Sequence, residues 1–364
     1  MSEASSSQAA APRIILPPCR YPGSNPTAHN IFAELAGIAA NQGNCPSLYL
    51  DATQAMSTGG ENHFQGVARS HKLSDGSIYY FLVRSDLDSG AHGNVLQYRY
   101  AGPTDGEHVL KTSPTPRVPL RKLLLSADQH PSDIAFLPDV NDLDAGYLFV
   151  IEEYDTRQLT VYRWSIEQDI VLLGHLFAGF PAVPSGGQGG PQFVFLDLVD
   201  DYYYLAVASE HWGWGQLFRA TPDELFPDCA EGSLDMDAFK PREMFPFPVI
   251  GGASQTKLVR DADGNWFLLG FRSVPNDDPN GTDYVDVFGV RFDPFIISTK
   301  LAQIHISFPA GDTGFANSGT HYVEKSGRLL ISSSYRWSEP LVPGTPPFPV
   351  PQDFVCRVDE LASW

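Results

Sequence analysis

The sequence predicts an all-β protein, and three observations support this prediction. Its 364 residues include 32 glycines and 30 prolines, which are residue types that separate short strands with turns. Periodic helical stretches are scarce, and only residues 32–42 (FAELAGIAANQ) and 221–226 (TPDELF) favour short helices. Strongly apolar segments of strand length recur at regular intervals along the chain, which indicates an internal repeat.

Each copy of the repeat has the same order of elements. A polar tripeptide precedes a short strand, and a turn, a strongly apolar strand, a polar hairpin and a third strand follow. In the first copy these segments are HFQGVARS (63–70), IYYFLVRS (78–85) and NVLQYRY (94–100). Four more copies begin at HPSDIAFL (130–137), GPQFVFLDL (190–198), ASQTKLVRD (253–261) and NSGTHYVE (317–324). The third residues of the opening tripeptides are separated by 67, 60, 63 and 64 residues: Gln65, Ser132, Gln192, Gln255 and Gly319.

This period and strand order predict a five-bladed β-propeller, in which each repeat forms a four-stranded blade around a central channel. We expect a disordered leader at 1–12 and a single domain at 13–364. Within this domain an N-terminal arm at 13–60 precedes the five repeats, which lie near 61–126, 127–186, 187–249, 250–313 and 314–360. The fifth copy ends after its third strand. An N-terminal strand, at 13–17 or at 47–51, is therefore expected to supply the missing outer strand and close the ring, which removes open sheet edges. A six-bladed ring is the alternative.

Composition excludes several classes of partner. The chain has 43 acidic and 24 basic residues and a formal net charge of −19, which repels the phosphate backbone of nucleic acids. No apolar run reaches the roughly 18 to 20 residues of a membrane span, and residues 1–12 lack the features of a secretory signal. We therefore expect neither a nucleic-acid nor a membrane partner. The sequence leaves open the oligomeric state and the compartment, whether secreted or cytoplasmic.

The sequence also predicts no metal and no cofactor. Its four cysteines, Cys19, Cys45, Cys229 and Cys356, form no zinc-binding pattern. Cys19 and Cys45 flank part of the N-terminal arm, and a disulfide between them and two free thiols are equally compatible with the sequence. The glycine run at 186–190 lacks the strand-to-helix setting of a phosphate-binding loop, and no GxSxG motif is present. A metal site formed by His63, His130 and His321 is disfavoured, because no supporting carboxylate pattern is visible beyond Asp133.

The repeats resemble the five-bladed β-propellers in architecture, from about residue 13 to the end of the chain, without matching a specific family within them. In propellers the innermost strand of each blade begins at the face where ligands usually bind. The resemblance therefore implies that the opening tripeptides surround the mouth of the channel. The alternative is that these polar side chains satisfy backbone groups and ordered water. The ring would contain His63, Gln65, His130, Ser132, Gln192, Ser254, Gln255 and Asn317, with His321 lying deeper.

The hairpins after the second strands are expected to reach the same face. Their first polar residues are Arg84, Glu152, Ser209, Arg272 and Ser334, followed among others by Glu210, His211, Tyr335 and Arg336. Such a rim suits a polar, hydroxylated or anionic ligand, although hairpin tips are polar in any soluble protein. Trp212, in the segment SEHWGWGQ (209–216), and Trp337 occupy matching places in two repeats. They are candidates to stack on a sugar ring, and filling gaps between blades is the alternative.

Two chemistries fit these residue types. Glycoside hydrolysis needs two carboxyl groups, about 5 to 9.5 Å apart depending on the stereochemical outcome. Five-bladed glycosidases usually carry an acidic residue at the start of the first innermost strand, and His63 and Gln65 depart from that pattern. Glu152 (or its neighbour Glu153) with Glu210 is the best available pair. A lyase would instead use a base such as His63, His211 or Tyr335. Its substrate would be a uronate, whose carboxylate Arg84, Arg272 or Arg336 would neutralise.

We therefore predict recognition, with or without turnover, of a polar or carbohydrate-like small molecule at the mouth of the channel by a hydrolase or lyase. The candidate catalytic residues are His63, Glu152, Glu210, His211 and Tyr335. The candidate ligand-binding residues are Gln65, Arg84, His130, Gln192, Trp212, Gln255, Arg272, Asn317, Arg336 and Trp337. A lectin without catalysis, a biosynthetic cyclase or isomerase, and an interaction scaffold are the alternatives. The repeats differ strongly at their hairpins, which favours one asymmetric site and hence an enzyme.

Overall fold

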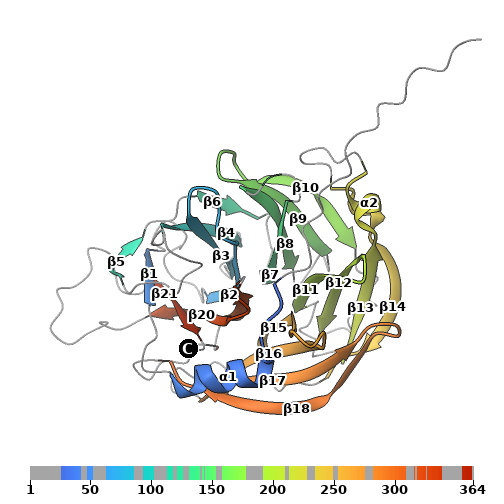
Figure 1. Cartoon of the computed structure of the whole chain (residues 1–364). Helices are drawn as coiled ribbons and strands as arrows, with labels where there is room; N and C mark the ends of the chain where they lie inside the picture. The colour runs from blue at the N-terminus through green and yellow to red at the C-terminus, as the bar shows by residue number, and fades with distance from the viewer. Residues whose placement is uncertain are drawn as a thin grey trace, which may run out of the picture.

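The computed structural model shows five antiparallel sheets arranged in a ring, which confirms the five-bladed β-propeller (Figure 1). The structure describes residues 26–41, 47–51, 63–85, 93–101, 113–117, 121–125, 131–139, 142, 144–152, 158–177, 192–209, 213–227, 234–248, 253–274, 282–308, 315, 318–324, 326–337 and 355–362. The predicted leader and the residues Cys19, Cys45 and Cys229 lie outside these ranges. No helix within them is long and apolar enough to cross a membrane.

The first four blades each contain four strands in chain order, and blade 1 omits β5. Blade 1 consists of β2 (His63–Arg69), β3 (Ser77–Ser85), β4 (Asn94–Ala101) and β6 (Arg121–Leu124). Blade 2 consists of β7 (Pro131–Pro138), β8 (Ala145–Glu152), β9 (Gln158–Ser165) and β10 (Val171–Phe177). Blade 3 consists of β11 (Phe193–Val199), β12 (Tyr202–Ser209), β13 (Trp214–Ala220) and β14 (Lys240–Pro246). Blade 4 consists of β15 (Ala253–Arg260), β16 (Trp266–Val274), β17 (Thr282–Arg291) and β18 (Ile296–Ile306).

Blade 5 closes the ring with strands from both ends of the chain. It begins with β19 (Ser318–Val323), β20 (Leu329–Trp337) and β21 (Val355–Ala362), and β1 (Ser47–Asp51) then pairs antiparallel with β21. The predicted closure by an N-terminal strand is therefore confirmed, and of the two candidate segments it is residues 47–51 that pair with β21. A strand not predicted, β5 (Ser113–Arg117), pairs in parallel with the outer edge of β1 and adds a fifth strand to this blade.

The blades are held together by apolar side chains that pack between neighbouring sheets. Between blades 1 and 2, the rings of Phe81 and Trp164 meet edge to face with centroids 5.2 Å apart. Equivalent clusters lie between blades 2 and 3, 3 and 4, and 4 and 5. Between blades 5 and 1, the Arg69 guanidinium lies 4.0 Å from the centre of the Tyr322 ring. Burial of each large apolar side chain contributes about 1.5–3 kcal/mol, so these interfaces supply much of the stability.

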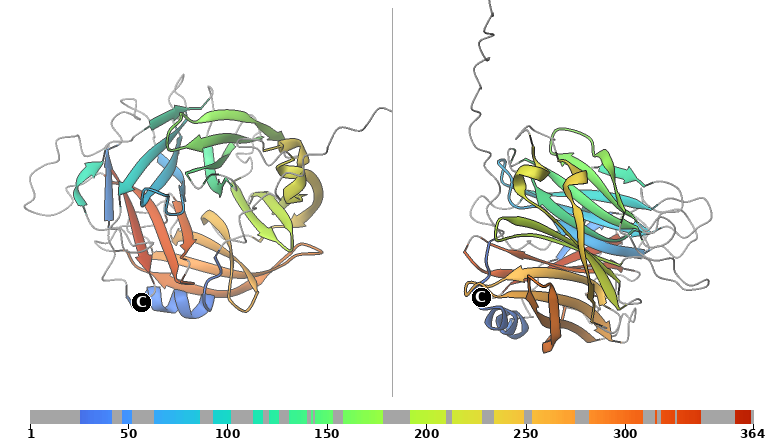
Figure 2. Two further views of the ribbon diagram at one scale, coloured as in Figure 1. Left: turned by 45° about the horizontal axis from the view of Figure 1, so that its top comes forward. Right: turned by 90° about the vertical axis from the view of Figure 1, so that its right-hand side faces the viewer.

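The two predicted helices are present. Helix α1 (Ile31–Ala40) begins at Asn30, whose side chain accepts a hydrogen bond from Ala33 N at 3.1 Å. Its buried stripe, Ile31, Leu35 and Ile38, joins the cluster between blades 4 and 5, and Figure 2 shows the helix on the outside of the ring. Helix α2 (Pro222–Leu225) begins with a capping box formed by Thr221 and Glu224. The short 3₁₀ helix η3 (Met236–Ala238) follows.

At the centre of the ring the innermost strands approach so closely that glycine is required. A Cβ atom at Gly66 on β2 would lie 2.7 Å from Val83 Cγ2 and 3.1 Å from both Asp133 Cα and Gln255 Nε2. A Cβ atom at Gly319 on β19 would lie 2.6 Å from Phe271 Cβ. These glycines therefore allow strands of different blades to pack against each other.

Gly66→Ala is expected to reduce the free energy of unfolding by about 1–3 kcal/mol, because the added methyl group overlaps a side chain and the neighbouring backbone. Gly174→Ala on β10 is the matched control, since its Cβ would meet only Met236 Sδ at 3.6 Å. Urea denaturation of the two variants measures the difference. Equal stability of both variants would show that the close approach at Gly66 is not a real constraint.

Candidate functional site

Strand register places the predicted mouth residues at one end of the channel. Phe64 on β2 pairs with Arg84, Pro131 on β7 with Glu152, and Ala253 on β15 with Arg272. In blade 5, Ser318 pairs with Ser334, and in blade 3 the N–H of Gln192 donates to the carbonyl of Ala208, next to Ser209. The start of each innermost strand and the end of each second strand therefore lie together in all five blades.

Three of the innermost strands contain a β-bulge at this end. The register shifts between Phe64 and Gly66, between Pro131 and Asp133, and between Ala253 and Gln255. The bulged residues are thus Gln65, Ser132 and Ser254, which are structurally equivalent. Gln255 corresponds to Gly66 and Asp133 and lies one residue deeper than the sequence alignment of the repeats placed it.

Below the mouth, the carboxylate of Asp133 accepts hydrogen bonds from several blades. Its Oδ1 atom accepts from Lys257 Nζ at 2.8 Å and from the side-chain amide of Gln255. It also accepts from the N–H of Ile134 at 2.7 Å, and Oδ2 accepts from the N–H of Val194 on β11 at 2.9 Å. These contacts link blades 2, 3 and 4 at the axis of the ring.

The same network extends to the remaining two blades. Gln255 Oε1 accepts from the N–H of Gly319 on β19 at 3.1 Å, and its Nε2 atom lies beside Gly66 on β2. Lys257 Nζ also donates to the carbonyl of Ile134 at 3.0 Å. Asp133 and Gln255 are fully buried, and Lys257 is 7% exposed. At this depth the channel is therefore occupied by protein side chains.

The protonation of Asp133 reflects two opposing influences. Burial raises the pKa of the Asp133 carboxyl above its usual range, while the Lys257 ammonium and the N–H groups of Val194 and Ile134 act to lower it. Each contact named above brings a donor to the carboxylate, which favours its ionised form. Asp133 and Lys257 thus form a buried ion pair whose two charges depend on each other.

His321 lies two residues beyond Gly319 on β19, deeper along the channel. The residue as a whole is partly exposed, but its Nδ1 atom is buried and has no hydrogen-bond partner among the described residues. Burial lowers the pKa of His321 to about 3, with a smaller contribution from the nearby positive charge of Lys257. The folded protein therefore holds this imidazole neutral at physiological pH.

Some of the predicted ligand-binding residues have described side chains. Gln65 and Gln192 are partly buried at the mouth, and Gln192 Oε1 lies 3.5 Å from the hydroxyl of Ser209. Arg84 is fully buried within blade 1. Arg272 lies on the blade 4 sheet, where its Nε donates to Asp286 at 2.8 Å and its guanidinium lies 5.3 Å from the centre of the Tyr284 ring. The Asp286 carboxylate also forms an ion pair with Lys300, whose Nζ lies 2.7 Å from Oδ2.

The other candidate residues are placed by their strands or lie outside the described ranges. His63, Glu152, Tyr335, Arg336 and Trp337 belong to β2, β8 and β20, but their side chains are not described. Outside the described ranges lie His130, Glu210, His211, Trp212 and Asn317. The roles predicted for all of these residues remain predictions. No cluster of three potential metal ligands occurs in the part of the chain that the structure describes.

Sequence reasoning missed the central role of Asp133 and Lys257. Both are charged residues flanked on either side by uncharged residues, in the segments HPSDIAFL and ASQTKLVRD. A charge at such a position in an innermost strand is rarely buried without a partner. Opposite charges in two innermost strands were therefore a usable signal for an ion pair at the axis.

Comparison with known proteins supports no family assignment. No protein-family model matches the chain, and no curated protein sequence does. Solved structures of similar fold include an exo-β-1,3-galactanase from Clostridium thermocellum, with a TM-score of 0.48 and 13% identity over 86% of this chain and 61% of that one. A family 117 glycoside hydrolase from Zobellia galactanivorans gives a TM-score of 0.41 and 10% identity over 88% and 90% of the two chains. A levansucrase from Bacillus subtilis gives a TM-score of 0.44 and 9% identity over 78% of this chain and 81% of that one. This chain thus spans about three fifths of the galactanase.

Breaking the buried ion pair is expected to destabilise the fold strongly. Asp133→Asn leaves the Lys257 ammonium without its counter-charge, and Lys257→Met leaves the Asp133 carboxylate without its counter-charge. Each change should reduce the free energy of unfolding by about 3–5 kcal/mol, and the double variant should lose less than the sum. Arg99→Gln, which removes the exposed ion pair with Asp75, should cost no more than about 1 kcal/mol. Additive effects in urea denaturation would contradict the coupling.

Stability is also expected to depend on pH through His321. Between pH 6.5, the ordinary pKa of histidine, and about 3, the unfolded chain binds a proton that the folded chain does not. The free energy of unfolding should therefore fall as the pH is lowered through this window. His321→Gln should weaken this fall, measured as a smaller difference in stability between pH 7 and pH 4.5. Parallel pH profiles of the variant and the native protein would show that His321 carries no such linkage.

Proposed function

We propose that the protein binds a glycan at the mouth of the central channel and hydrolyses it with carboxyl groups carried by blades 2 and 3. The observation that supports the proposal is the shared register, in which the starts of the innermost strands pair with the ends of the second strands. Gln65, Gln192 and Arg272 each retain some exposure there. A polar site of this kind, at the end of a ring, suits a ligand with many hydroxyl groups.

The closed channel below the mouth supports a single site. Because Asp133, Lys257 and Gln255 fill the axis, a ligand that enters from the mouth meets a floor made of hydrogen-bonded side chains. The residues at equivalent mouth positions also differ from blade to blade, as with Arg84, Glu152 and Arg272. Five equivalent lectin pockets would need similar groups in every blade, so the arrangement favours one asymmetric site.

The proposed chemistry assigns the two carboxyl roles to Glu152 and Glu210. Glu152 is the last residue of β8, and Glu210 follows directly after β12 in the neighbouring blade. One carboxyl group would protonate the leaving oxygen, and the other would act on the sugar or on the attacking water. Arg272, held by Asp286 on the blade 4 sheet, is a candidate contact for the hydroxyl groups of the sugar.

The test is incubation with pooled neutral and uronate-containing oligosaccharides, followed by mass spectrometry of the protein-bound and free fractions. Hydrolysis adds one water across the two products, whereas elimination adds none and leaves an unsaturated fragment. Glu152→Gln and Glu210→Gln should each reduce turnover by about 100-fold or more. Glu167→Gln is the matched control, because this exposed carboxylate of the same blade lies in the turn between β9 and β10, at the other end of the sheet.

The remaining outcomes decide between the alternatives. A retained but unchanged oligosaccharide would replace the hydrolase with a glycan-binding protein. Unsaturated products would replace it with a lyase. The absence of both binding and turnover would reject the carbohydrate proposal, and equal activity of Glu152→Gln and Glu167→Gln would reject the assigned carboxyl pair.

A further inference from the structure

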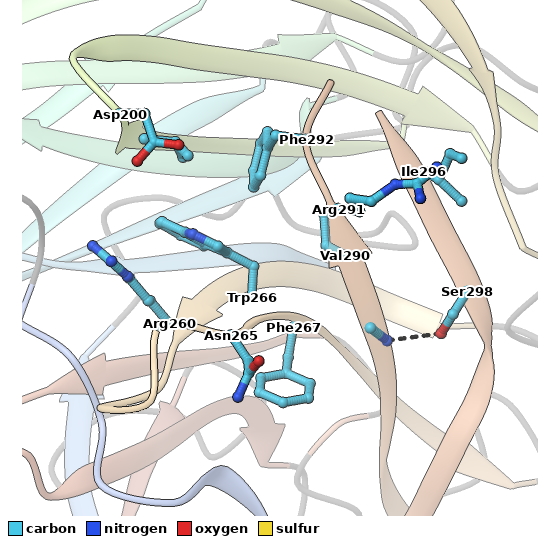
Figure 3. A pocket seen from close by; sticks show the side chains of 13 residues that line it. Asp200, Arg260, Asn265, Trp266, Phe267, Val290, Arg291, Phe292, Ile296 and Ser298 are labelled. Atoms are coloured by element: carbon cyan, nitrogen blue, oxygen red, sulfur yellow. Dashed lines mark hydrogen bonds between the residues drawn. The ribbon is translucent and has the colours of Figure 1, made fainter. Parts of the chain in front are cut away.

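A second candidate binding site lies between blades 3 and 4, away from the mouth of the channel. It is a cavity of about 650 Å³, within the range typical of small-molecule sites. Blade 3 contributes the turn between β11 and β12, and blade 4 contributes the ends of β15 and β17 and the starts of β16 and β18. Figure 3 shows the side chains that the argument uses: Asp200, Arg260, Asn265, Trp266, Arg291 and Phe292.

The cavity lies at the face of the disc opposite the mouth. β15 runs from Gln255, just below the mouth, to Arg260, which lines the cavity. Five residues of extended strand cover about 16 Å. β11 likewise begins beside Gln192 at the mouth and ends at Val199, next to Asp200. The cavity is therefore a site separate from the proposed glycan site.

Aromatic packing holds the walls of the cavity in place. The Phe292 ring packs against Trp266 with centroids 5.4 Å apart and against Tyr204 of blade 3 at 4.7 Å. The same turn is fixed at Phe295, whose N–H donates to Glu243 Oε1 of β14 at 2.9 Å. Because the turn between β17 and β18 is tied to blade 3 in this way, the cavity exists before any ligand binds.

Arg260 is the side chain that indicates which kind of ligand the cavity binds. Its guanidinium carbon lies 5.8 Å from the centre of the Trp266 ring. Its Nε atom is buried and has no hydrogen-bond acceptor among the described residues. A buried donor without an acceptor is unfavourable, and a guanidinium matches the two oxygens of a carboxylate with parallel hydrogen bonds. A second arginine, Arg291, is exposed along the same cavity.

We propose that this cavity binds a small ring compound that bears a carboxylate, with the carboxylate on Arg260 and the ring against Phe292 and Trp266. Figure 3 shows the Asp200 carboxylate and the Asn265 amide at other parts of the cavity wall. These two groups provide an acceptor and a donor for polar substituents on the ring. Sugar acids and aromatic acids share this chemistry, and the binding experiment separates them.

The experiment measures binding of glucuronate, benzoate and the neutral methyl glucoside to the full chain by saturation-transfer NMR and calorimetry. At least one of the two acids should bind, and the neutral sugar should bind more weakly. Preference for glucuronate identifies a sugar acid, and preference for benzoate identifies an aromatic acid. Arg260→Gln should weaken binding of the preferred acid by roughly tenfold or more, because it removes a charged hydrogen-bond donor.

Arg242→Gln is the matched control, since Arg242 is an exposed arginine of β14 that does not line the cavity. It should bind the acid as the native protein does. Arg260→Lys and the exposed Arg291→Gln provide further variants should Arg260→Gln fail to fold, and both should weaken binding. The proposal is overturned if neither acid binds, or if the Arg260 and Arg291 variants bind as well as the Arg242 variant. Glycan turnover, measured in parallel, should not change in the Arg260 variants.

Discussion

The arrangement of the five blades depends on one buried carboxylate. Asp133 receives hydrogen bonds from Lys257 and Gln255 of blade 4 and from the backbone of blade 3, and Gln255 carries the network on to blade 5. Blade 1 contributes a glycine whose missing side chain leaves room for this contact. Apolar packing between blades is non-directional and would tolerate small rotations of one sheet against the next. The hydrogen bonds to the Asp133 carboxylate are directional, so they fix the depth at which the five innermost strands meet.

This network has a consequence for where a ligand can bind. In a propeller the axis is the natural place for a site, but here the axis below the mouth is filled by the side chains that hold the blades. A buried ion pair tolerates little displacement, because a shift of either charge leaves the other one uncompensated. The described side chains at this depth thus leave the axis itself closed to a ligand. The network also breaks the fivefold symmetry, since only blade 2 supplies the carboxylate and only blade 4 the ammonium.

The fold could be predicted from the sequence because each blade repeats the same short-range signals. Strand alternation, turn residues and the period of the copies are local features. The missing fourth strand of the last copy left residues 13–17 or 47–51 as its partner, and the structure shows the second segment there. What could not be predicted was register. A β-bulge at Gln65, Ser132 or Ser254 adds one residue without a distinctive sequence mark. The structural equivalent of Gln65 is therefore Ser254, and Gln255 lies one residue deeper, towards the axis. The strand β5 was also missed, because its residues Ser113–Arg117 contain two prolines and lie at an outer edge, where strand signals are weak.

The distribution of charge explains why the two candidate sites should prefer different ligands. The chain carries a net charge of −19, so a cation that is not already paired with a carboxylate favours the binding of an anion. Lys257 forms an ion pair with Asp133. Arg272 and Lys300 both pair with Asp286, and Arg328 pairs with Glu324. Arg163 and Arg219 each have a buried Nε without an acceptor, but each makes another hydrogen bond, to Asp139 and to Tyr204. Arg260 instead lies over an aromatic ring at the edge of a cavity, which leaves its charge available to a carboxylate. The mouth, where the described arginines are buried or paired, is better suited to hydroxyl groups.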